Sequence, residues 1–224
     1  MGLRRDRVLL AGERHEETVD FSEWLLPAAA RVLARAACGM GDVDLFGVAT
    51  GPGSFTGLRV GLTTVKAWAE VYKKPVVGVS RLEAMARRAW NKEGYRAAFY
   101  DAHRGEIFGA LYFLKGHDWC AVGGEQVMAP GGFLEFVEAN CQERHVSWVS
   151  LDPELLRSVP GWRSRELRGE DILCPDWALA DGVGELAEER AQAGRFTSVL
   201  ELDANYVRRS DAEIYWKGRT DSAR

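Results

Sequence analysis

The glycine-rich stretch Gly51-Pro-Gly-Ser-Phe-Thr-Gly-Leu-Arg-Val-Gly61 places the narrowest limit on how this chain can fold. It follows Leu45-Phe-Gly-Val-Ala49, an apolar run typical of a buried strand, and a helical pattern over 57–72 begins inside it. Glycines free the backbone at such a place, and the first N–H groups of a helix have no partner within the helix. The stretch therefore predicts a tight turn between a strand and a helix, which could hold an anion.

Known catalytic and phosphate-binding motifs do not fit this turn. In a Walker loop the spacing from Gly51 to Gly57 is one residue too long, and Leu58 stands where the lysine belongs. A dinucleotide fingerprint that starts at Gly51 needs glycine where Thr56 stands. A nucleophile elbow around Ser54 needs glycines at 52 and 56. On spacing alone we favour a structural turn in which Ser or Thr caps the helix.

The segments around the turn predict a parallel sheet covered by helices. A helix, a strand and another helix follow the strand 45–49, which is a βαβ order. The expected elements of this first lobe are a strand at Val8–Ala11, a helix from a capping box at Asp20–Glu23 to about Ala37, the helix 57–72, a strand at Val76–Val79, and a helix from the capping box Ser80–Glu83 to about Trp90.

The pattern changes after Asn91–Gly94, which we take as the boundary between two lobes. Strands at 97–100 and 106–114 are expected to form a hairpin joined by 101–105, and a helix near 133–141, a strand near 146–149 and a helix near 177–193 follow. The predicted organisation is a two-lobed α/β protein with a first lobe over 1–94, a second lobe over 95–203 and a C-terminal segment over 204–224.

Two helices of the first lobe carry more apolar surface than one sheet face can cover. In the helix 57–72 the polar residues Arg59, Thr63, Lys66 and Glu70 form one narrow stripe, and the helix after Asp20 is also apolar nearly all round. The two helices either cover each other completely or are buried by another subunit, and we favour the second. The residues expected at this interface are Trp24, Leu25, Ala28, Val32, Gly57, Arg59, Gly61, Leu62, Val65 and Trp68.

Composition limits the class of partner and the kind of site. The net charge of −4 over 224 residues argues against direct binding of nucleic acid, which needs a basic surplus, so any tRNA contact is expected to run through a partner. The four cysteines, Cys38, Cys120, Cys141 and Cys174, form no C-x-x-C pair and are expected to be small buried side chains in a reducing compartment. The charged start contains no signal peptide and no membrane span, which favours a cytoplasmic location.

Several motifs together resemble the TsaB (YeaZ-like) family. The glycine-rich stretch is similar to the family's signature, and Ser22-Glu-Trp-Leu-Leu-Pro27 and Ser80-Arg-Leu-Glu-Ala84 resemble its first and third helices. Asp101-Ala-His-Arg-Gly-Glu106 resembles the hairpin motif of its second lobe, and Tyr206-Val-Arg208 its near-terminal Tyr-x-Arg. The family-motif residues are Gly51, Pro52, Gly53, Ser54, Phe55, Thr56, Asp101, Arg104, Gly105, Glu106, Tyr206 and Arg208.

The resemblance implies an actin/Hsp70/sugar-kinase-like (ribonuclease H-like) fold and a role without catalysis by this chain. Family members pair with the catalytic threonylcarbamoyltransferase paralogue (TsaD-like) through the two apolar helices, and they can also form a homodimer there. With an ATPase subunit (TsaE-like), the complex transfers a threonylcarbamoyl group to adenosine 37 of tRNAs that read ANN codons. No catalytic residue, metal or cofactor is expected in this chain, whose histidines show no His-x-x-x-His spacing.

Two departures from the family pattern qualify this expectation. Val8–Ala11 resembles the third strand of the family's first lobe, so the first two strands, one of which carries an Asp-Thr/Ser motif, are expected to be missing. Their absence would leave sheet edges unpaired. Phe21 also stands where the family commonly has histidine.

Two alternatives remain open at this point. The chain could be a stand-alone ATP-dependent or peptidase-like enzyme of the same fold, although Asp101 and Glu106 are the only carboxylates within motifs and a hairpin turn explains them as well. Direct tRNA binding could use Arg87-Arg88 and Arg208-Arg209, but solvated surface pairs explain these equally.

Overall fold

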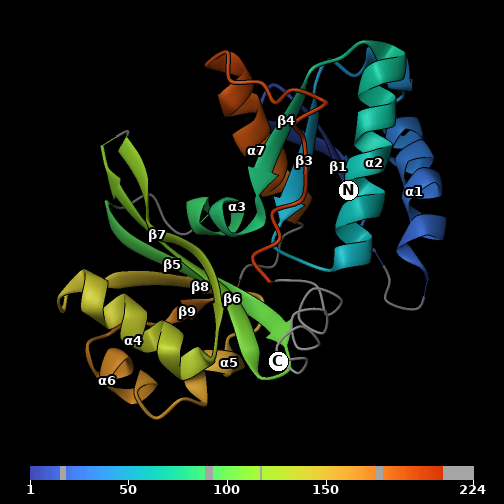
Figure 1. Ribbon diagram of the computed structural model, residues 1–224. Helices are drawn as coiled ribbons and strands as arrows, with labels where there is room; N and C mark the ends of the chain where they lie inside the picture. The colour runs from blue at the N-terminus through green and yellow to red at the C-terminus, as the bar shows by residue number, and fades with distance from the viewer. Residues whose placement is uncertain (16–18, 89–92, 117, 175–178, 209–224) are drawn as a thin grey trace, which may run out of the picture.

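Two α/β lobes make up the computed structural model, which describes residues 1–15, 19–88, 93–116, 118–174 and 179–208 (Figure 1). The first lobe contains two separate strand pairs. Strands β1 (Gly2–Arg5) and β2 (Val8–Gly12) form an antiparallel hairpin, whereas β3 (Phe46–Gly51) and β4 (Val76–Ser80) run parallel. Helices of the same lobe are α1 (Phe21–Arg35), α2 (Phe55–Tyr72), α3 (Arg81–Arg87) and α7 (Leu179–Gln192), with a 3-10 turn, η1, at Met40–Asp42.

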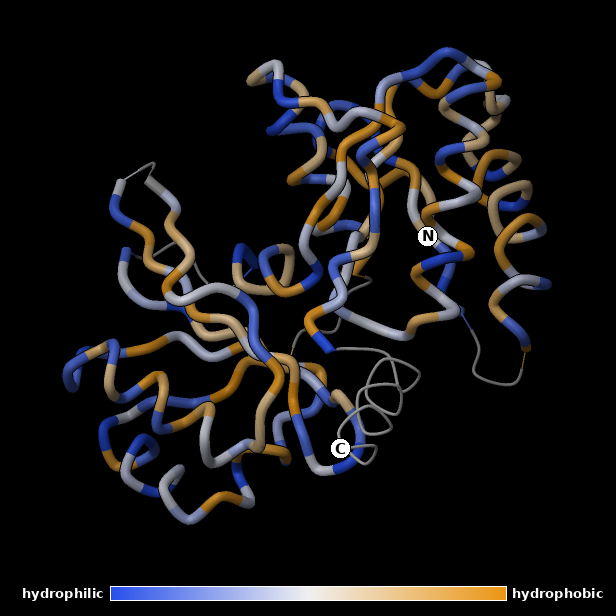
Figure 2. Tube along the Cα trace, viewed as in Figure 1, coloured by the Kyte–Doolittle hydropathy of each residue, from blue (hydrophilic) through white to orange (hydrophobic). Residues whose placement is uncertain are grey.

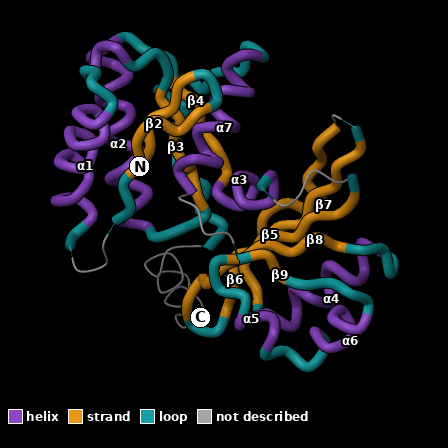
Figure 3. The backbone as a smooth tube through the Cα atoms, turned by 180° about the vertical axis from the view of Figure 1, so that it is seen from behind, coloured by secondary structure: helices purple, strands orange, loops and turns teal. Residues whose placement is uncertain are grey.

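Helices cover both faces of these strands. Figures 1 and 3 show α1 and α2 on one side of the first lobe and α7 on the other. The α2 side of β3 and β4 is packed by Leu62 and Val65, and the α7 side by Val183 and Leu186. Because both faces are covered, the strands β3 and β4 are apolar on both sides, and Figure 2 shows hydrophobic residues gathered along them.

The second lobe is built on a five-stranded sheet. Its strands are ordered β7-β6-β5-β8-β9, where β5 is Gly94–His103, β6 Glu106–Lys115, β7 Asp118–Met128, β8 Val146–Ser150 and β9 Ile172–Leu173. One face packs against α4 (Pro130–Cys141), with α5 (Glu154–Arg157) and α6 (Trp162–Leu167) beside it. Gly109 allows the close approach of α4, since a Cβ there would lie 2.6 Å from the Phe133 ring. The opposite face packs against α3, which therefore lies between the lobes.

Most of the predicted elements are confirmed. The βαβ order gives the parallel pair β3 and β4 with α2 between them, and the hairpin predicted at 97–114 forms as β5 and β6. Ser80 caps α3 by accepting a hydrogen bond from the Glu83 N–H at 3.1 Å, as the capping box predicts. The end of the predicted helix at Trp90 and the start of the one at Trp177 lie outside the described residues.

The capping box predicted at Asp20 is wrong. Asp20 does occupy the N-cap position of α1, but its side chain makes no hydrogen bond to the helix. Helix α1 instead begins with backbone bonds from Glu23 and Trp24 to the Asp20 carbonyl, both 3.0 Å long.

The expectation of two missing strands is half wrong. The charged start of the chain forms β1, which pairs with β2 through a two-residue turn at Asp6 and Arg7, both with positive φ. A strand can form there because its one inward-facing charge is paired: Arg4 contacts Asp181 and Glu188 of α7. Among the described residues no strand lies between β1 and β3, so the two pairs of the first lobe do not form one sheet.

The cysteines differ in exposure. Cys141 is buried in the second lobe, where desolvation raises the pKa of its thiol to about 12. The prediction of a buried side chain is wrong for Cys120 and Cys174, which are exposed, and Cys38 is half-buried. No described helix is both long and apolar enough to cross a bilayer.

Candidate partner-binding face and motif cluster

The two apolar helices of the first lobe pack largely within their own lobe. Six of the ten predicted interface residues have their side chains buried in this packing. On α1 these are Trp24, Leu25, Ala28 and Val32, and on α2 they are Leu62 and Val65. Their contact with a partner stays a prediction, and it would require the partner to approach over the outer surface of the helices.

The other four predicted residues differ in position. Arg59 is exposed, whereas Gly57, Gly61 and Trp68 are half-buried and line the large cavity inside the lobe. Trp68 also packs against Phe46 of β3, with the two ring centres 5.9 Å apart. Large apolar side chains lie exposed on the same two helices: Leu26, Phe55, Val71 and Tyr72. We call the exposed surface of α1 and α2 the outer helical face.

The glycine-rich turn is a structural turn with a helix cap. Ser54 occupies the N-cap of α2 and accepts a hydrogen bond from the Gly57 N–H at 3.4 Å, which confirms the capped-turn interpretation. Gly51 has φ of +124°, and a Cβ there would lie 2.9 Å from the Asn205 carbonyl oxygen. Pro52 and Gly53 complete the turn, and Thr56 lies in the first turn of α2. Tyr100 joins the turn to the second lobe by donating a hydrogen bond to the Pro52 carbonyl.

The start of α2 and the C-terminal segment form one aromatic and cationic cluster. The guanidinium of Arg59 lies 3.7 Å from the Phe55 ring centre, and its Nε donates to the Tyr206 hydroxyl at 3.0 Å. The rings of Phe55 and Tyr206 are 5.1 Å apart. Two motifs that are distant in sequence, the glycine-rich stretch and Tyr206-x-Arg208, therefore meet at the outer end of the turn.

The other residue of the C-terminal motif binds the hairpin of the second lobe. Arg208 donates to the Ala102 carbonyl at 2.7 Å and forms an ion pair with Glu106. In this hairpin the Asp101 carboxylate accepts from the His103 N–H at 2.7 Å, as expected of an aspartate that starts a turn. Arg104 and Gly105, both with positive φ, form the turn itself. The motif carboxylates thus have structural partners.

A carboxylate that the sequence did not indicate lies between the lobes. Glu125 of β7 accepts a hydrogen bond from Ser80 of the first lobe and another from Asn205 Nδ2 at 2.6 Å. The Tyr112 hydroxyl lies 3.5 Å away. Burial raises the pKa of the Glu125 carboxyl above its ordinary value, and hydrogen bonds from Ser80 and Tyr112 act in the opposite direction. No sequence pattern could have revealed this contact, because it joins three distant segments.

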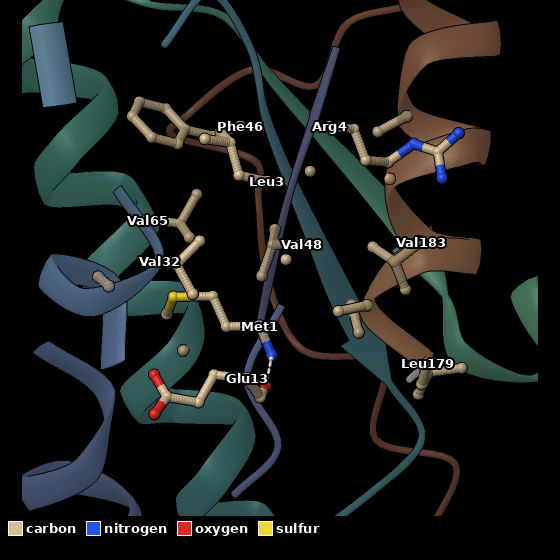
Figure 4. A pocket seen from close by; sticks show the side chains of 18 of the residues that line it. Met1, Leu3, Arg4, Glu13, Val32, Phe46, Val48, Val65, Leu179 and Val183 are labelled. Carbon is tan, nitrogen blue, oxygen red and sulfur yellow. Dashed lines mark hydrogen bonds between the residues drawn. The ribbon is translucent and has the colours of Figure 1, made fainter. Parts of the chain in front are cut away.

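A mainly apolar cavity of about 1490 Å³ separates β1 from β3, and we call it the strand groove (Figure 4). Figure 4 shows Met1, Val32 and Val65 on the side of α1 and α2, with Val183 and Leu179 on the side of α7. Folded interiors contain few voids larger than a water molecule. A cavity of this size inside a lobe is therefore a gap in the sheet rather than ordinary packing.

In the part of the chain that is described, the His, Cys, Asp and Glu side chains form no group of three or more able to hold a metal ion. The two-lobed architecture, with a helix between the lobes and a motif turn at the start of a long helix, defines a class of actin/Hsp70/sugar-kinase-like proteins.

Comparison with known proteins identifies the family within this class. The model of the TsaD family, described as tRNA N6-adenosine threonylcarbamoyltransferase, matches residues 16–150. Proteins named tRNA threonylcarbamoyladenosine biosynthesis protein TsaB are similar along most of the chain. The one from Bacillus subtilis is 34% identical, with 80% of this chain and 76% of that protein covered. The one from Escherichia coli is 27% identical, with 88% and 84% covered.

Solved structures agree with this assignment. A Pseudomonas aeruginosa protein, described as similar to the peptidase YEAZ, superposes with a TM-score of 0.62 at 25% identity over 83% of both chains. YeaZ from Pseudomonas aeruginosa superposes with a TM-score of 0.61 at 22% identity over 83% of both chains, which supports the fold. The chain belongs to the TsaB (YeaZ-like) family.

Proposed function

We propose that this chain is a non-catalytic subunit of the complex that transfers a threonylcarbamoyl group to adenosine 37 of ANN-decoding tRNAs. Its relatives are named for the biosynthesis of threonylcarbamoyladenosine in tRNA. The Asp101 carboxylate is hydrogen-bonded to the hairpin backbone, and the Glu106 carboxylate is paired with Arg208. These contacts favour a non-catalytic role over that of a stand-alone kinase or peptidase. The chain acts in the cytoplasm in this proposal, together with the tRNA substrate.

The outer helical face is the proposed binding surface for a TsaD-like catalytic paralogue. The observation that carries the proposal is the presence of large apolar side chains exposed on both helices, Leu26 of α1 and Val71 of α2 among them. Burial of these side chains against a partner helix would stabilise the pair. The same face would serve a homodimer when the paralogue is absent, and a TsaE-like ATPase would join the assembled pair.

The sharpest test is the substitution Leu26→Arg. Because Leu26 is 57% exposed, the arginine can be accommodated without disturbing the lobe. We expect Leu26→Arg to weaken binding to the co-expressed TsaD-like paralogue at least about tenfold, as for a charge placed in an apolar interface. Binding is measured by affinity co-purification and by titration of the purified proteins.

A matched control is Leu167→Arg, which makes the same change at a leucine of α6 in the second lobe that is 76% exposed. It should bind the paralogue as the unmodified chain does. Val65→Glu is a poorer probe, since Val65 is 9% exposed and its substitution would disturb the core. If Leu26→Arg and Leu167→Arg bind equally well, the outer helical face is not the interface. Turnover of ATP or peptide by the purified chain alone would argue for the enzyme alternative.

A further inference from the structure

The last described residues of the chain tie the two lobes together. After α7 the chain returns along the first lobe, where the Thr197 N–H donates to the Val76 carbonyl at 2.8 Å and Leu202 is buried in the core between α2 and the strands β3 and β4. In Figure 1 this segment, coloured red, runs from α7 to the level at which the two lobes meet. We call its last part, residues 205–208, the strap.

The residues of the strap contact different parts of the molecule. The Asn205 N–H donates to the Thr50 carbonyl of β3 at 2.7 Å, and the Asn205 side chain donates to Glu125 of β7 at 2.6 Å. Val207 packs against the core that the second-lobe sheet shares with α3. Arg208 binds the hairpin formed by β5 and β6. The one remaining residue of the strap therefore has its backbone fixed from both sides.

That residue, Tyr206, holds the guanidinium of Arg59 in place. The Tyr206 hydroxyl accepts a hydrogen bond from Arg59 Nε at 3.0 Å, and the guanidinium carbon lies 5.9 Å from the centre of the Tyr206 ring. The Phe55 ring lies closer, with its centre 3.7 Å from the same carbon. A guanidinium held by a hydrogen bond and by two aromatic rings loses little further conformational freedom when it binds a ligand.

The two Nη atoms of Arg59 have no hydrogen-bond or ion-pair partner among the residues that the structure describes. In this respect Arg59 differs from Arg31 and Arg208, which pair with carboxylates. Phe55 and Tyr206 are 41% and 40% exposed, so the guanidinium lies at the surface with aromatic rings beside it. The planar fork of a guanidinium matches a carboxylate, and Arg and Tyr are enriched among the residues that contribute most to protein–protein binding.

We propose that Arg59 binds a carboxylate of the TsaD-like partner, and that Tyr206, fixed by the strap, is the residue that positions Arg59 for this contact. The inference rests on the proposed function, because Arg59 lies on the outer helical face. A phosphate of nucleic acid carries the same sign of charge, but the net charge of −4 opposes its approach. The exposed Leu26 and Val71 on the same face favour a protein surface instead. The strap makes this contact depend on the second lobe.

The first test replaces Arg59 and measures binding of the purified TsaD-like paralogue by titration calorimetry. We expect Arg59→Ala to bind at least about tenfold more weakly, as for an interface residue that contributes much of the binding free energy. Because an ion pair is lost, the affinity of this variant should also depend less on salt concentration. Arg59→Lys keeps the charge without the planar fork and should restore only part of the affinity. The matched control, Arg163→Ala, changes an arginine of the second lobe whose side chain is 75% exposed, and it should bind as the unmodified chain does.

The second test asks whether the strap positions Arg59. Tyr206→Phe keeps the ring and removes the hydroxyl, whereas Arg208→Met releases the strap from the hairpin of the second lobe. Each variant should bind the paralogue about two- to tenfold more weakly, the range for one hydrogen bond. Each should also speed up hydrogen exchange at Arg59 Nε, measured by NMR without the partner. In the Arg59→Ala background neither change should lower the affinity further, since both act through Arg59.

Three outcomes would overturn the proposal. The first is that Arg59→Ala binds the paralogue as tightly as Arg163→Ala does. The second is that Tyr206→Phe and Arg208→Met leave the affinity unchanged, or lower it equally in the Arg59→Ala background, as a general destabilisation would. The third is that Arg59→Ala weakens only the binding of tRNA to the assembled complex, which would make a phosphate the ligand.

The proposed function fails in a different way. If Leu26→Arg abolishes binding of the paralogue and Arg59→Ala does not weaken it, only the inference about Arg59 is wrong. If neither substitution weakens binding, the outer helical face is not the interface and both are wrong.

Discussion

At the residue scale, the most demanding site is a buried ion pair in the second lobe. Arg165 and Glu170 are 1% and 3% exposed, and their charged groups lie 3.2 Å apart. Glu170 also accepts hydrogen bonds from the Trp148 indole at 2.7 Å and from the Val146 N–H at 3.1 Å. Two buried charges that are paired and hydrogen-bonded in this way are tolerated, but either charge left without the other strongly destabilises the fold.

We therefore expect Glu170→Gln to lower the free energy of unfolding by about 3–5 kcal/mol, the usual loss when one partner of a buried pair is removed. Urea unfolding followed by fluorescence of the buried Trp148 and Trp162 measures this change. Glu138→Gln is the control, since the Glu138 side chain is 43% exposed although it also contacts Arg165. If Glu138→Gln lowered the free energy of unfolding by more than about 1 kcal/mol, the difference in exposure would not explain the expected difference between the two ion pairs.

Local residue roles could be predicted from the sequence, whereas distant ones could not. Asp101 was expected to start a turn, and it does so by bonding a backbone N–H two residues away. No sequence pattern marks Glu170 or Glu125, because their hydrogen-bond partners are brought together only by the folded sheet. The exposure of Cys120 was also not predicted. Cys120 lies on β7, and because this strand was not predicted, the alternation of its side chains between the two faces of the sheet could not be used.

At the scale of elements, turns and caps decide where helices begin. Helix α2 begins at Phe55, two residues before the predicted start, because Ser54 rather than Thr56 is the cap. Apolar periodicity predicted α1, α2 and β3 well, since each forms a buried face. It missed β1, where Arg4 is paired with acidic residues of α7 that lie far away in the sequence.

The cap gives a prediction at this scale. Ser54→Ala removes the hydrogen bond to the Gly57 N–H and should lower the free energy of unfolding by about 0.5–2 kcal/mol. Thr56→Ala, in the exposed first turn of the same helix, should change it by less than about 0.5 kcal/mol. Thermal unfolding measures both variants, and equal losses would mean that the Ser54 hydroxyl does not act as the cap.

At the scale of the whole molecule, the two lobes are joined by buried polar contacts as well as by α3. Ser80 and Asn205 from the first lobe both donate to Glu125 of the second. Tyr100 of the second lobe donates to the Pro52 carbonyl in the glycine-rich turn. The arrangement of the lobes is therefore sensitive to the ionisation of one carboxyl group.

This sensitivity predicts a pH dependence. Burial holds the folded-state pKa of Glu125 above its unfolded value, so the folded state binds the proton more tightly. The stability gained from protonation is fully present below the unfolded pKa and is lost as pH rises through the folded one. The Gln side chain in the Glu125→Gln variant does not titrate. The melting temperature of the variant, relative to that of the unmodified chain, should therefore increase as pH rises from 4.5 to 7.5. A difference that is constant with pH would contradict the assignment.

The position of α7 has a consequence for how the protein is made. Helix α7 closes the first lobe against β1 and β3, yet it lies 177 residues after Arg4, which it pairs through Asp181. During synthesis the whole second-lobe sheet, from β5 to β9, leaves the ribosome before this helix does. The second lobe can thus fold on the nascent chain, while the first lobe, although made earlier, stays incompletely covered until α7 has been made.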